Sequence, residues 1–267
     1  MPLLHLLTVA LLQGLTEFLP VSSSGHLVLL PALTGMADQG LVVDVAVHVG
    51  TLFAVVIYFR EDVARALSGV VRVVRRDFCH PDAQLALGLA VATLPVVIVG
   101  LSLRLSGHEE ALRSITVVAW ATLIFGLVLY WADRTGAQTR DAGDWTLRDA
   151  LLMGVWQMVS LIPGTSRSGM CISVARRLGY ARQDAARLAM LMSIPTIAAS
   201  GVLLSGDVML RMDAAAARDA AIATVFAFIA ALAALELMMR LLKSVSFTPY
   251  VIYRVVLGLV LLAIAYG

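Results

Sequence analysis

Long apolar stretches separated by short polar segments make up most of this chain. Six of the stretches approach the roughly 20 residues that an α-helix needs to cross a bilayer. They lie at 41–59, 84–105, 115–131, 188–204, 220–239 and 249–266. We therefore predict an all-α, polytopic integral membrane protein with these six segments as transmembrane helices.

Two further apolar segments are interrupted by polar and helix-breaking residues. The first runs over 3–19, is broken at 20–26 and resumes at 27–33. The second runs over 151–162 and is broken at 163–169, before a short apolar piece follows. Irregular backbone at membrane depth is tolerated only against protein or a water-filled cavity. Each segment therefore predicts a re-entrant helical hairpin.

The distribution of basic residues predicts the orientation. Of the 20 Lys and Arg residues, 14 lie in segments that the spans place on one side of the membrane and four on the other; Arg167 and Arg254 lie within membrane segments. The basic segments are 60–82, 133–148, 176–187 and 240–246. Because basic loops stay in the cytoplasm, both termini are expected on the outer side. Apolar residues at helical spacing within the first basic segment indicate that part of it lies along the membrane surface.

The order of elements repeats along the chain. A hairpin followed by three spans occurs twice, and the second copy crosses the membrane in the opposite sense. We expect a single membrane domain, 1–267, in which 1–132 and 147–267 form an inverted repeat joined by a cytoplasmic linker at 133–146. Interrupted helices in corresponding halves point to a binding site where the repeats meet. An offset of 144 residues aligns Gln13 with Gln157, Ser22 with Ser166, Ser24 with Ser168 and Gly25 with Gly169.

The composition excludes several classes of protein. The chain is 60% hydrophobic and only 14% charged, whereas a soluble domain averages about 25% charged residues. A large soluble helical protein is therefore excluded. Cys79 and Cys171 are too few for a disulfide framework or a cysteine metal cluster. No nucleotide-binding glycine loop occurs, and we expect no nucleic-acid partner.

Carboxylates and amides within apolar segments are candidate chemical groups. Gln13 and Glu17 are four residues apart and share a helix face. A carboxylate at a bilayer centre costs roughly 2.5–3.5 kcal/mol. Glu17 is therefore expected to act as a general base or to bind a hard divalent cation, unless protonation or a hydroxyl neutralises it. Asp44 and His48 also share a face, and they either line the same cavity or form hydrogen bonds between helices.

Hydroxyls, a glycine and an imidazole complete the first break. Ser22, Ser23 and Ser24, with the free N–H groups around Gly25, are expected to form an anion site at the start of a half-helix. Capping alone is the alternative, but it needs a single serine. His26 is expected to transfer protons, with a packed core histidine as the alternative.

The second break surrounds an arginine with hydroxyls. Thr165, Ser166 and Ser168 flank Arg167, and a guanidinium has the planar fork that suits phosphate. The alternative is an Arg167 that extends to the membrane interface. Together, the two breaks predict phosphate-ester or diphosphate chemistry on a substrate that is itself in the membrane.

Two motifs in these breaks resemble those of a known family. QGLTEFLPVSSSGH at 13–26 and PGTSRSG at 163–169 resemble the two signatures of the undecaprenyl-diphosphatase family, also called bacitracin-resistance proteins. DVAVHVGT at 44–51 resembles a further family segment. The resemblance covers essentially the whole chain, including its length and its order of spans.

The resemblance implies a multi-pass enzyme of the bacterial cytoplasmic (inner) membrane. Such an enzyme removes the terminal phosphate of undecaprenyl diphosphate. The product, undecaprenyl phosphate, is the lipid carrier reused in peptidoglycan synthesis, and the activity confers resistance to bacitracin. The family depends on a divalent cation, here expected to be Mg²⁺ or Ca²⁺. Its fold of interlocked inverted repeats is expected to open the active site toward the periplasm.

The residues that the resemblance marks as functional map onto both breaks. We expect catalytic roles for Glu17, Ser23, His26 and Arg167, and substrate binding by Gln13, Ser22, Ser24, Gly25, Thr165, Ser166 and Ser168. Many family members carry Glu where this chain has Gln13, so we assign the essential carboxylate and the metal ligand to Glu17 alone. Ser23 is the favoured nucleophile, and direct attack by water fits the sequence equally well.

Two other functions compete with this interpretation. A transporter of lipid phosphates or small anions is the first, because transporters also have inverted repeats with broken helices. A type-2 phosphatidic-acid phosphatase is the second, since 24–26 and 166–167 resemble fragments of its motifs. However, no His follows Arg167 within the next dozen residues and no Lys precedes the serine run. The sequence leaves the assembly state open, with a homodimer as one candidate.

Overall fold

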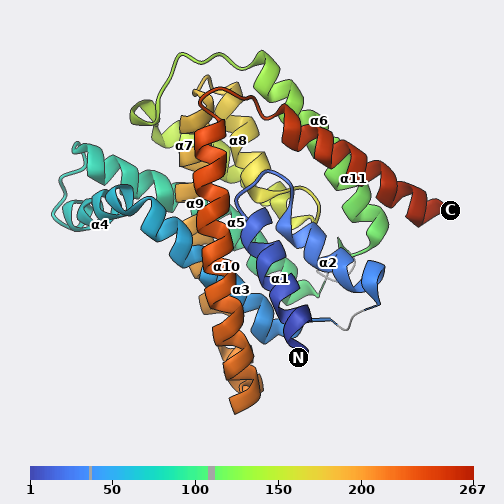
Figure 1. Cartoon of the computed structure of the whole chain (residues 1–267). Coiled ribbons are helices and arrows are strands. Elements are labelled where there is room, and N and C mark those ends of the chain that lie inside the picture. Colours follow the sequence, from blue (N-terminus) through green and yellow to red (C-terminus); the bar gives the residue numbers. More distant parts are fainter. Residues whose placement is uncertain (36–37, 108–111) are drawn as a thin grey trace.

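The computed structural model describes residues 1–35, 38–107 and 112–267, and these are almost entirely helical (Figure 1). No β-strand occurs in these ranges, which confirms the all-α fold class. The helices are α1 (Leu3–Thr16), α2 (Ser23–Thr34), α3 (Gly40–Tyr58), α4 (Arg60–Val74), α5 (Pro81–Ser106), α6 (Ile115–Thr135), α7 (Leu147–Gln157), α8 (Arg167–Arg177), α9 (Arg182–Arg211), α10 (Ala214–Leu241) and α11 (Thr248–Tyr266), with short 3₁₀ turns at Ala142–Asp144 and Met158–Leu161.

Six helices are long and apolar enough to cross a membrane. They are α3, α5, α6, α9, α10 and α11, and each coincides with one of the six predicted spans to within a residue or contains it. The protein is therefore a multi-pass membrane protein, as predicted. Its two interrupted segments also form helix–break–helix units, because 17–22 separate α1 from α2 and 162–166 separate the turn after α7 from α8.

Helices α9 and α10 extend furthest beyond the predicted spans. The spans 188–204 and 220–239 leave 205–219 between them, but α9 continues to Arg211 and α10 begins at Ala214. Asp213 caps α10 by accepting a hydrogen bond of 2.7 Å from the backbone N–H of Ala216. The predicted spans were too short because hydropathy detects only where the apolar residues stop. The backbone hydrogen bonds of a helix can continue through polar residues beyond that point.

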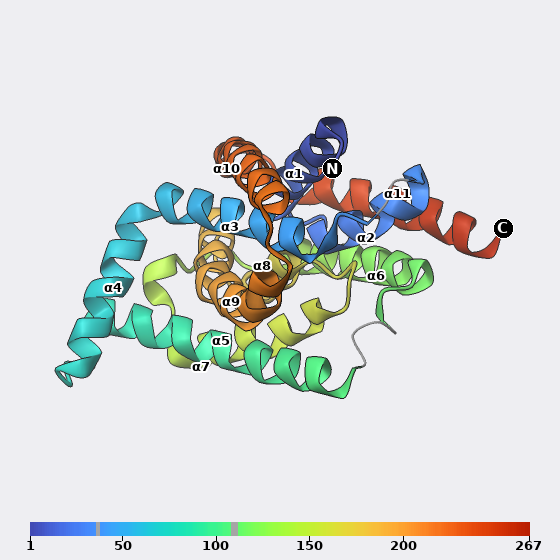
Figure 2. The same cartoon turned by 90° about the horizontal axis from the view of Figure 1, so that it is seen from below.

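Close helix packing positions the polar groups of α1 and α3. Both helices pack against α10, whereas α6 runs along α11 (Figures 1 and 2). A Cβ at Gly14 would lie 2.6 Å from the carbonyl oxygen of Ala227, and one at Gly50 would lie 2.3 Å from that of Thr224. Only glycine permits this approach. Because Glu17 follows Gly14 within one turn and His48 precedes Gly50, the same contacts set the positions of both side chains.

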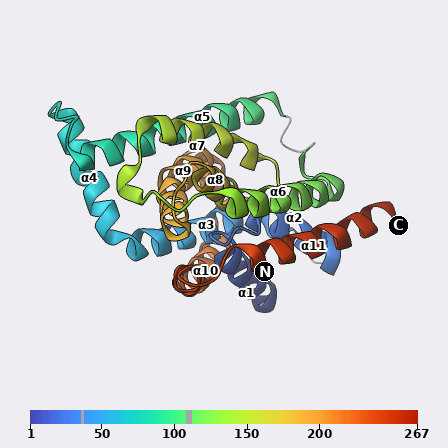
Figure 3. The ribbon, with the colours of Figure 1, turned by 90° about the horizontal axis from the view of Figure 1, so that it is seen from above.

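Helix α4 lies at the end of the molecule opposite the C-terminus (Figures 2 and 3). It carries the first basic segment and exposes a row of apolar side chains that includes Leu67, Val70 and Val74. Such an amphipathic helix is suited to the plane of a membrane interface. The expected placement of this helix along the membrane surface stays a prediction.

A buried ion-pair cluster joins four helices at the cytoplasmic side that the sequence predicts. Asp133 at the end of α6 accepts hydrogen bonds from Arg176 Nε on α8 at 2.9 Å and from Arg182 Nε on α9 at 2.8 Å. It also accepts one from the N–H of Phe247, just before α11, at 3.3 Å. Arg176 is fully buried and its remaining N–H groups donate to backbone carbonyls. Removing one partner of such a pair leaves a buried charge unpaired.

We predict that Asp133→Ala lowers the thermal stability of the detergent-purified protein. The lost partner should cost about 3–5 kcal/mol, which corresponds to roughly 2–4 °C in Tm for each kcal/mol. Glu236→Gln is the matched control, because it removes a carboxylate from an exposed pair with Arg240 and should cost under about 1 kcal/mol. Equal shifts of the melting temperature in the two variants would contradict the assigned role of Asp133.

Candidate functional site

The two helix breaks share one local geometry. Ser22, before α2, has a φ of 74° and its Oγ accepts a hydrogen bond of 3.3 Å from the N–H of Gly25. Ser166, before α8, has a φ of 73° and its Oγ accepts one of 3.1 Å from the N–H of Gly169. Positive φ is uncommon for residues other than glycine. Each break therefore holds a strained serine that caps the half-helix following it.

The two breaks also contact each other directly. The backbone N–H of Gly164 donates to Ser22 Oγ at 3.2 Å. In return, Ser168 Oγ donates to the carbonyl oxygen of Leu19 at 3.0 Å. Segments far apart in the sequence thus supply each other's hydrogen-bond partners.

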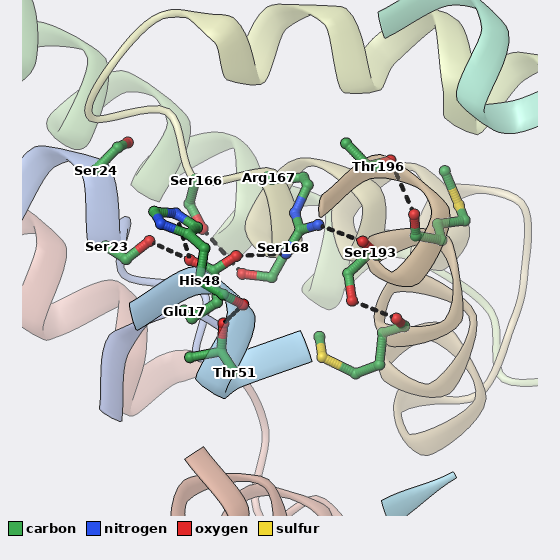
Figure 4. A network of polar contacts seen from close by, with 12 residues as sticks. Glu17, Ser23, Ser24, His48, Thr51, Ser166, Arg167, Ser168, Ser193 and Thr196 are labelled. Atoms are coloured by element: carbon green, nitrogen blue, oxygen red, sulfur yellow. Dashed lines mark hydrogen bonds and ion pairs between the residues drawn. The ribbon is translucent and has the colours of Figure 1, made fainter. Parts of the chain in front are cut away.

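Glu17 is the centre of the group of polar side chains in Figure 4. Its Oε1 lies 2.7 Å from Arg167 Nη2, which forms an ion pair across the two breaks. Its Oε2 accepts hydrogen bonds from Ser23 Oγ at 2.6 Å and from Gln13 Nε2 at 2.8 Å. The Glu17 side chain is 7% exposed, so the pair is largely shielded from solvent. The structure thus brings together Gln13, Glu17, Ser23 and Arg167.

Arg167 is held from its other side by α9. Its Nη1 donates to the carbonyl oxygen of Ser193 at 3.2 Å. The side chain of Arg167 remains 14% exposed, so the guanidinium has a fixed orientation while part of it stays accessible. A guanidinium fixed in this way is preorganised to bind an oxyanion.

The imidazole nearest to Glu17 is that of His48, on α3. His48 Nε2 lies 3.9 Å from Glu17 Oε2, and Nδ1 lies 2.7 Å from the carbonyl oxygen of Asp44. A carbonyl oxygen only accepts hydrogen bonds, so Nδ1 carries the proton. In the neutral ring, Nε2 therefore has a lone pair on the side of Glu17. Of the two roles left open for His48 by the sequence, the structure shows the one in which it lines the site.

His26 lies in a different environment. Its Nδ1 is 2.7 Å from the carbonyl oxygen of Ser22, and its Nε2 is 2.5 Å from the hydroxyl of Tyr253 on α11. The His26 ring also stacks on the Tyr253 ring. Both nitrogens are therefore occupied, and no hydrogen bond or ion pair joins His26 to Glu17 within the described ranges.

The remaining predicted residues lie around this centre. Ser24 is exposed and lies 3.4 Å from Ser22 Oγ, while Ser166 and Ser168 are buried with their hydroxyls 3.1 Å apart. Thr165 is fully buried, and its Oγ1 has no hydrogen-bond partner. The sequence did not indicate the roles of Ser193 and Tyr253. Ser193 contacts Arg167 through its backbone carbonyl, which every residue has, and Tyr253 is a single tyrosine within an apolar span.

The donor set fits a divalent cation that takes most of its ligands from a substrate. No cluster of three or more His, Cys, Asp or Glu suited to a metal occurs among the described residues. Glu17 is the one carboxylate of the site, and the buried Oε1 of Gln13 beside it has no hydrogen-bond partner. Mg²⁺ is commonly bound by one or two carboxylates together with substrate phosphates. Glu17 and Gln13 Oε1 therefore supply suitable oxygens for such a cation.

The site combines the guanidinium of Arg167, which can bind an anion, with a hydroxyl that is hydrogen-bonded to the Glu17 carboxylate. The imidazole of His48 lies beside the same carboxylate. Arg167 and the N-termini of α2 and α8 attract negative charge. Ser23 can pass its proton to Glu17, with which it already forms a hydrogen bond. This set of groups matches the transfer or hydrolysis of a phosphoryl group.

Comparison with known proteins agrees with this chemistry. The profile of the family described as "Bacitracin resistance protein BacA" matches residues 6–260. A protein of Ruegeria pomeroyi named "Undecaprenyl-diphosphatase" is 65% identical over 267 residues, which is the full length of both chains. Proteins of the same name from Dinoroseobacter shibae and Chromohalobacter salexigens are 66% and 44% identical, over 100% and 97% of each chain. The chain therefore belongs to the bacitracin resistance protein BacA family.

Proposed function

We propose that this chain hydrolyses undecaprenyl diphosphate to undecaprenyl phosphate and inorganic phosphate, and so confers bacitracin resistance. The observation that carries the proposal is the buried Glu17–Arg167 pair, with Ser23 on the same carboxylate. The name shared by full-length relatives supports the substrate. Recycling of the lipid carrier for peptidoglycan synthesis follows from this reaction.

In this mechanism the diphosphate replaces Glu17 as the partner of Arg167. Phosphate oxygens accept the guanidinium hydrogen bonds, and the N–H groups at the starts of α2 and α8 support the charge that develops in the transition state. Displacement from Arg167 frees Glu17 Oε1, which had been bound to the guanidinium. The substrate itself thereby makes this oxygen available.

Ser23 then attacks the terminal phosphorus. A bond forms between Ser23 Oγ and phosphorus, the bond from phosphorus to the bridging oxygen breaks, and the hydroxyl proton passes to Glu17. Undecaprenyl phosphate leaves with the bridging oxygen. Water then forms a bond to phosphorus, and His48 Nε2 takes the proton of that water. The bond from phosphorus to Ser23 Oγ breaks, inorganic phosphate leaves, and Glu17 returns its proton to Ser23. Direct attack by water on the substrate uses the same residues, with Ser23 as a binding group.

Glu17 and Gln13 Oε1 would hold a Mg²⁺ or Ca²⁺ ion, which would neutralise charge on the diphosphate. Ser22 and Ser168 join the two breaks by hydrogen bonds with Gly164 and Leu19, and Ser166 caps α8. Gln13 also donates to Glu17, which keeps the carboxylate oriented toward Ser23.

We also propose two halves related by an inverted repeat, each with a re-entrant hairpin. Such a repeat would account for the similar φ angles and similar caps of Ser22 and Ser166. The basic segments favour a cytoplasmic position for the Asp133 cluster, and we propose that the site opens toward the periplasmic side of the inner membrane.

The ion pair gives the first test of the function. Glu17→Gln and Arg167→Lys should each lower phosphate release from undecaprenyl diphosphate by at least about a hundredfold in detergent, because each removes a preorganised charge. The exposed pair supplies matched controls, and Glu236→Gln and Arg240→Lys should retain wild-type rates. Chelator should abolish release, and added Mg²⁺ or Ca²⁺ should restore it. No release by folded wild-type protein would reject hydrolysis and favour the transporter.

Adjacent serines give a test of the nucleophile. Ser23→Ala should lower kcat by about a thousandfold or more, because it removes the attacking oxygen. Ser24→Ala, on an exposed neighbouring residue, should lower it by less than about tenfold. Near-normal turnover by Ser23→Ala would exclude a serine nucleophile and leave direct attack by water.

The two histidines give a third test. His48→Gln should lower kcat by about a hundredfold and flatten the acid limb of the pH–rate profile, because the proton acceptor is lost. His26→Gln should lower kcat far less, since neither ring nitrogen is free to accept a proton. The reverse order of effects would return the proton-transfer role to His26.

A further inference from the structure

Arg254, on α11, is an arginine that is fully buried without an acidic partner. Its exposed fraction is 0%. Charged side chains are rarely buried completely unless they are paired. No Asp or Glu in the described part of the chain forms an ion pair with it, and every contact that fixes its guanidinium is to a backbone carbonyl.

Those carbonyls belong to both breaks and to α6. Arg254 Nη1 donates to Pro20 at 3.3 Å in the first break. Nη2 donates to Gly164 at 2.9 Å and to Thr165 at 2.8 Å in the second break. Nε donates to Thr122 on α6 at 3.2 Å. One rigid, planar group thus holds carbonyls of both breaks at a fixed separation.

Two glycines provide the space for this side chain. A Cβ at Gly126 would lie 3.1 Å from Arg254 Cβ, and a Cβ at Gly169 would lie 2.9 Å from Arg254 Nη1. Gly169 ends the second sequence motif and lies in the first turn of α8. The guanidinium is therefore packed against the turn that also begins with Arg167.

The charge of Arg254 has an electrostatic consequence for the site. It adds a positive charge beside the N-termini of α2 and α8, which are themselves positive. Carbonyl dipoles solvate this charge but do not cancel it. An anion between the two breaks would balance it, and a diphosphate is such an anion.

We infer that Arg254 is a positioning residue for the diphosphate site. It fixes the two breaks so that Ser23 and Arg167 face the same substrate, and its charge strengthens phosphate binding without contact to the substrate. This inference rests on the proposed diphosphatase function. Arg254 would contribute in two separable ways: its planar guanidinium positions the two breaks, and its positive charge strengthens phosphate binding.

Two substitutions separate these contributions. Arg254→Lys keeps the charge but loses the fork, so kcat should fall by about a hundredfold through misplacement, while the affinity for undecaprenyl phosphate stays within about threefold. Arg254→Met loses both, so kcat should fall similarly and the affinity should fall by at least about tenfold. Affinity is measured as the inhibition of phosphate release by undecaprenyl phosphate, and by ligand-induced shifts of the melting temperature.

Arg176→Lys is the control for a purely structural role. Arg176 is equally buried, but its partners belong to the Asp133 cluster. This variant should lose thermal stability while its monodisperse fraction keeps kcat and product affinity within about threefold. If Arg254→Met fails to fold, Gly126→Ala gives the second measurement, because it displaces Arg254 by a few tenths of an ångström and should lower kcat alone.

Either of two results would overturn the inference. One is an unchanged kcat and product affinity in folded Arg254→Lys and Arg254→Met, or unchanged kcat in Gly126→Ala. The other is a lower melting temperature in the Arg254 variants with kcat and product affinity unchanged in the monodisperse fraction, which is the behaviour expected of Arg176→Lys. Inactive wild-type protein would instead reject the proposed function, so the two failures are distinguishable.

Discussion

The polar backbone groups exposed by each helix break must find their partners in the protein, and here they find them in the other break. Gly164 donates to Ser22, Ser168 donates to the carbonyl of Leu19, and Arg254 binds carbonyls of both segments. Apolar surroundings offer no water to replace these partners. Neither break is satisfied alone, so the two must meet. The chemical groups that they carry are brought together as a consequence.

The same requirement acts on charge at the centre of the site. Glu17 and Arg167 neutralise each other across the breaks, and hydrogen bonds from Ser23 and Gln13 satisfy the remaining carboxylate oxygen. A phosphate can take the place of the carboxylate, because it offers the guanidinium the same acceptor geometry. With an amide at Gln13, the incoming diphosphate is repelled by one carboxylate rather than two.

The two buried ion-pair clusters, one around Asp133 and one around Glu17, differ in how fully their polar atoms are hydrogen-bonded. Around Asp133, Arg176 and Arg182 share one carboxylate and the other donors are bonded to carbonyls. Gln13 Oε1 beside Glu17 and Thr165 Oγ1 in the second break are buried without a partner. Buried polar atoms are almost always hydrogen-bonded, so these two oxygens have unused capacity to bind a donor or a cation. The site at the breaks therefore still has polar atoms that can bind a ligand, whereas the polar atoms of Asp133 and Arg176 already have partners.

The sequence by itself determined the helical class, the six spans, the two breaks and most of the residues that meet there. Hydropathy reports which helical faces avoid water, and the motifs place Glu17, Ser23 and Arg167 in the breaks. The tertiary structure decided which imidazole stands beside the carboxylate, since His48 and His26 differ in their packing against α10 and Tyr253 rather than in residue type. It also decided the contacts of Arg254, which donates to five backbone carbonyls from three separate segments. Every residue has a carbonyl, so the sequence gives no sign of which ones Arg254 binds. Local sequence fixes what each segment is, but contacts between distant segments exist only once the helices have packed.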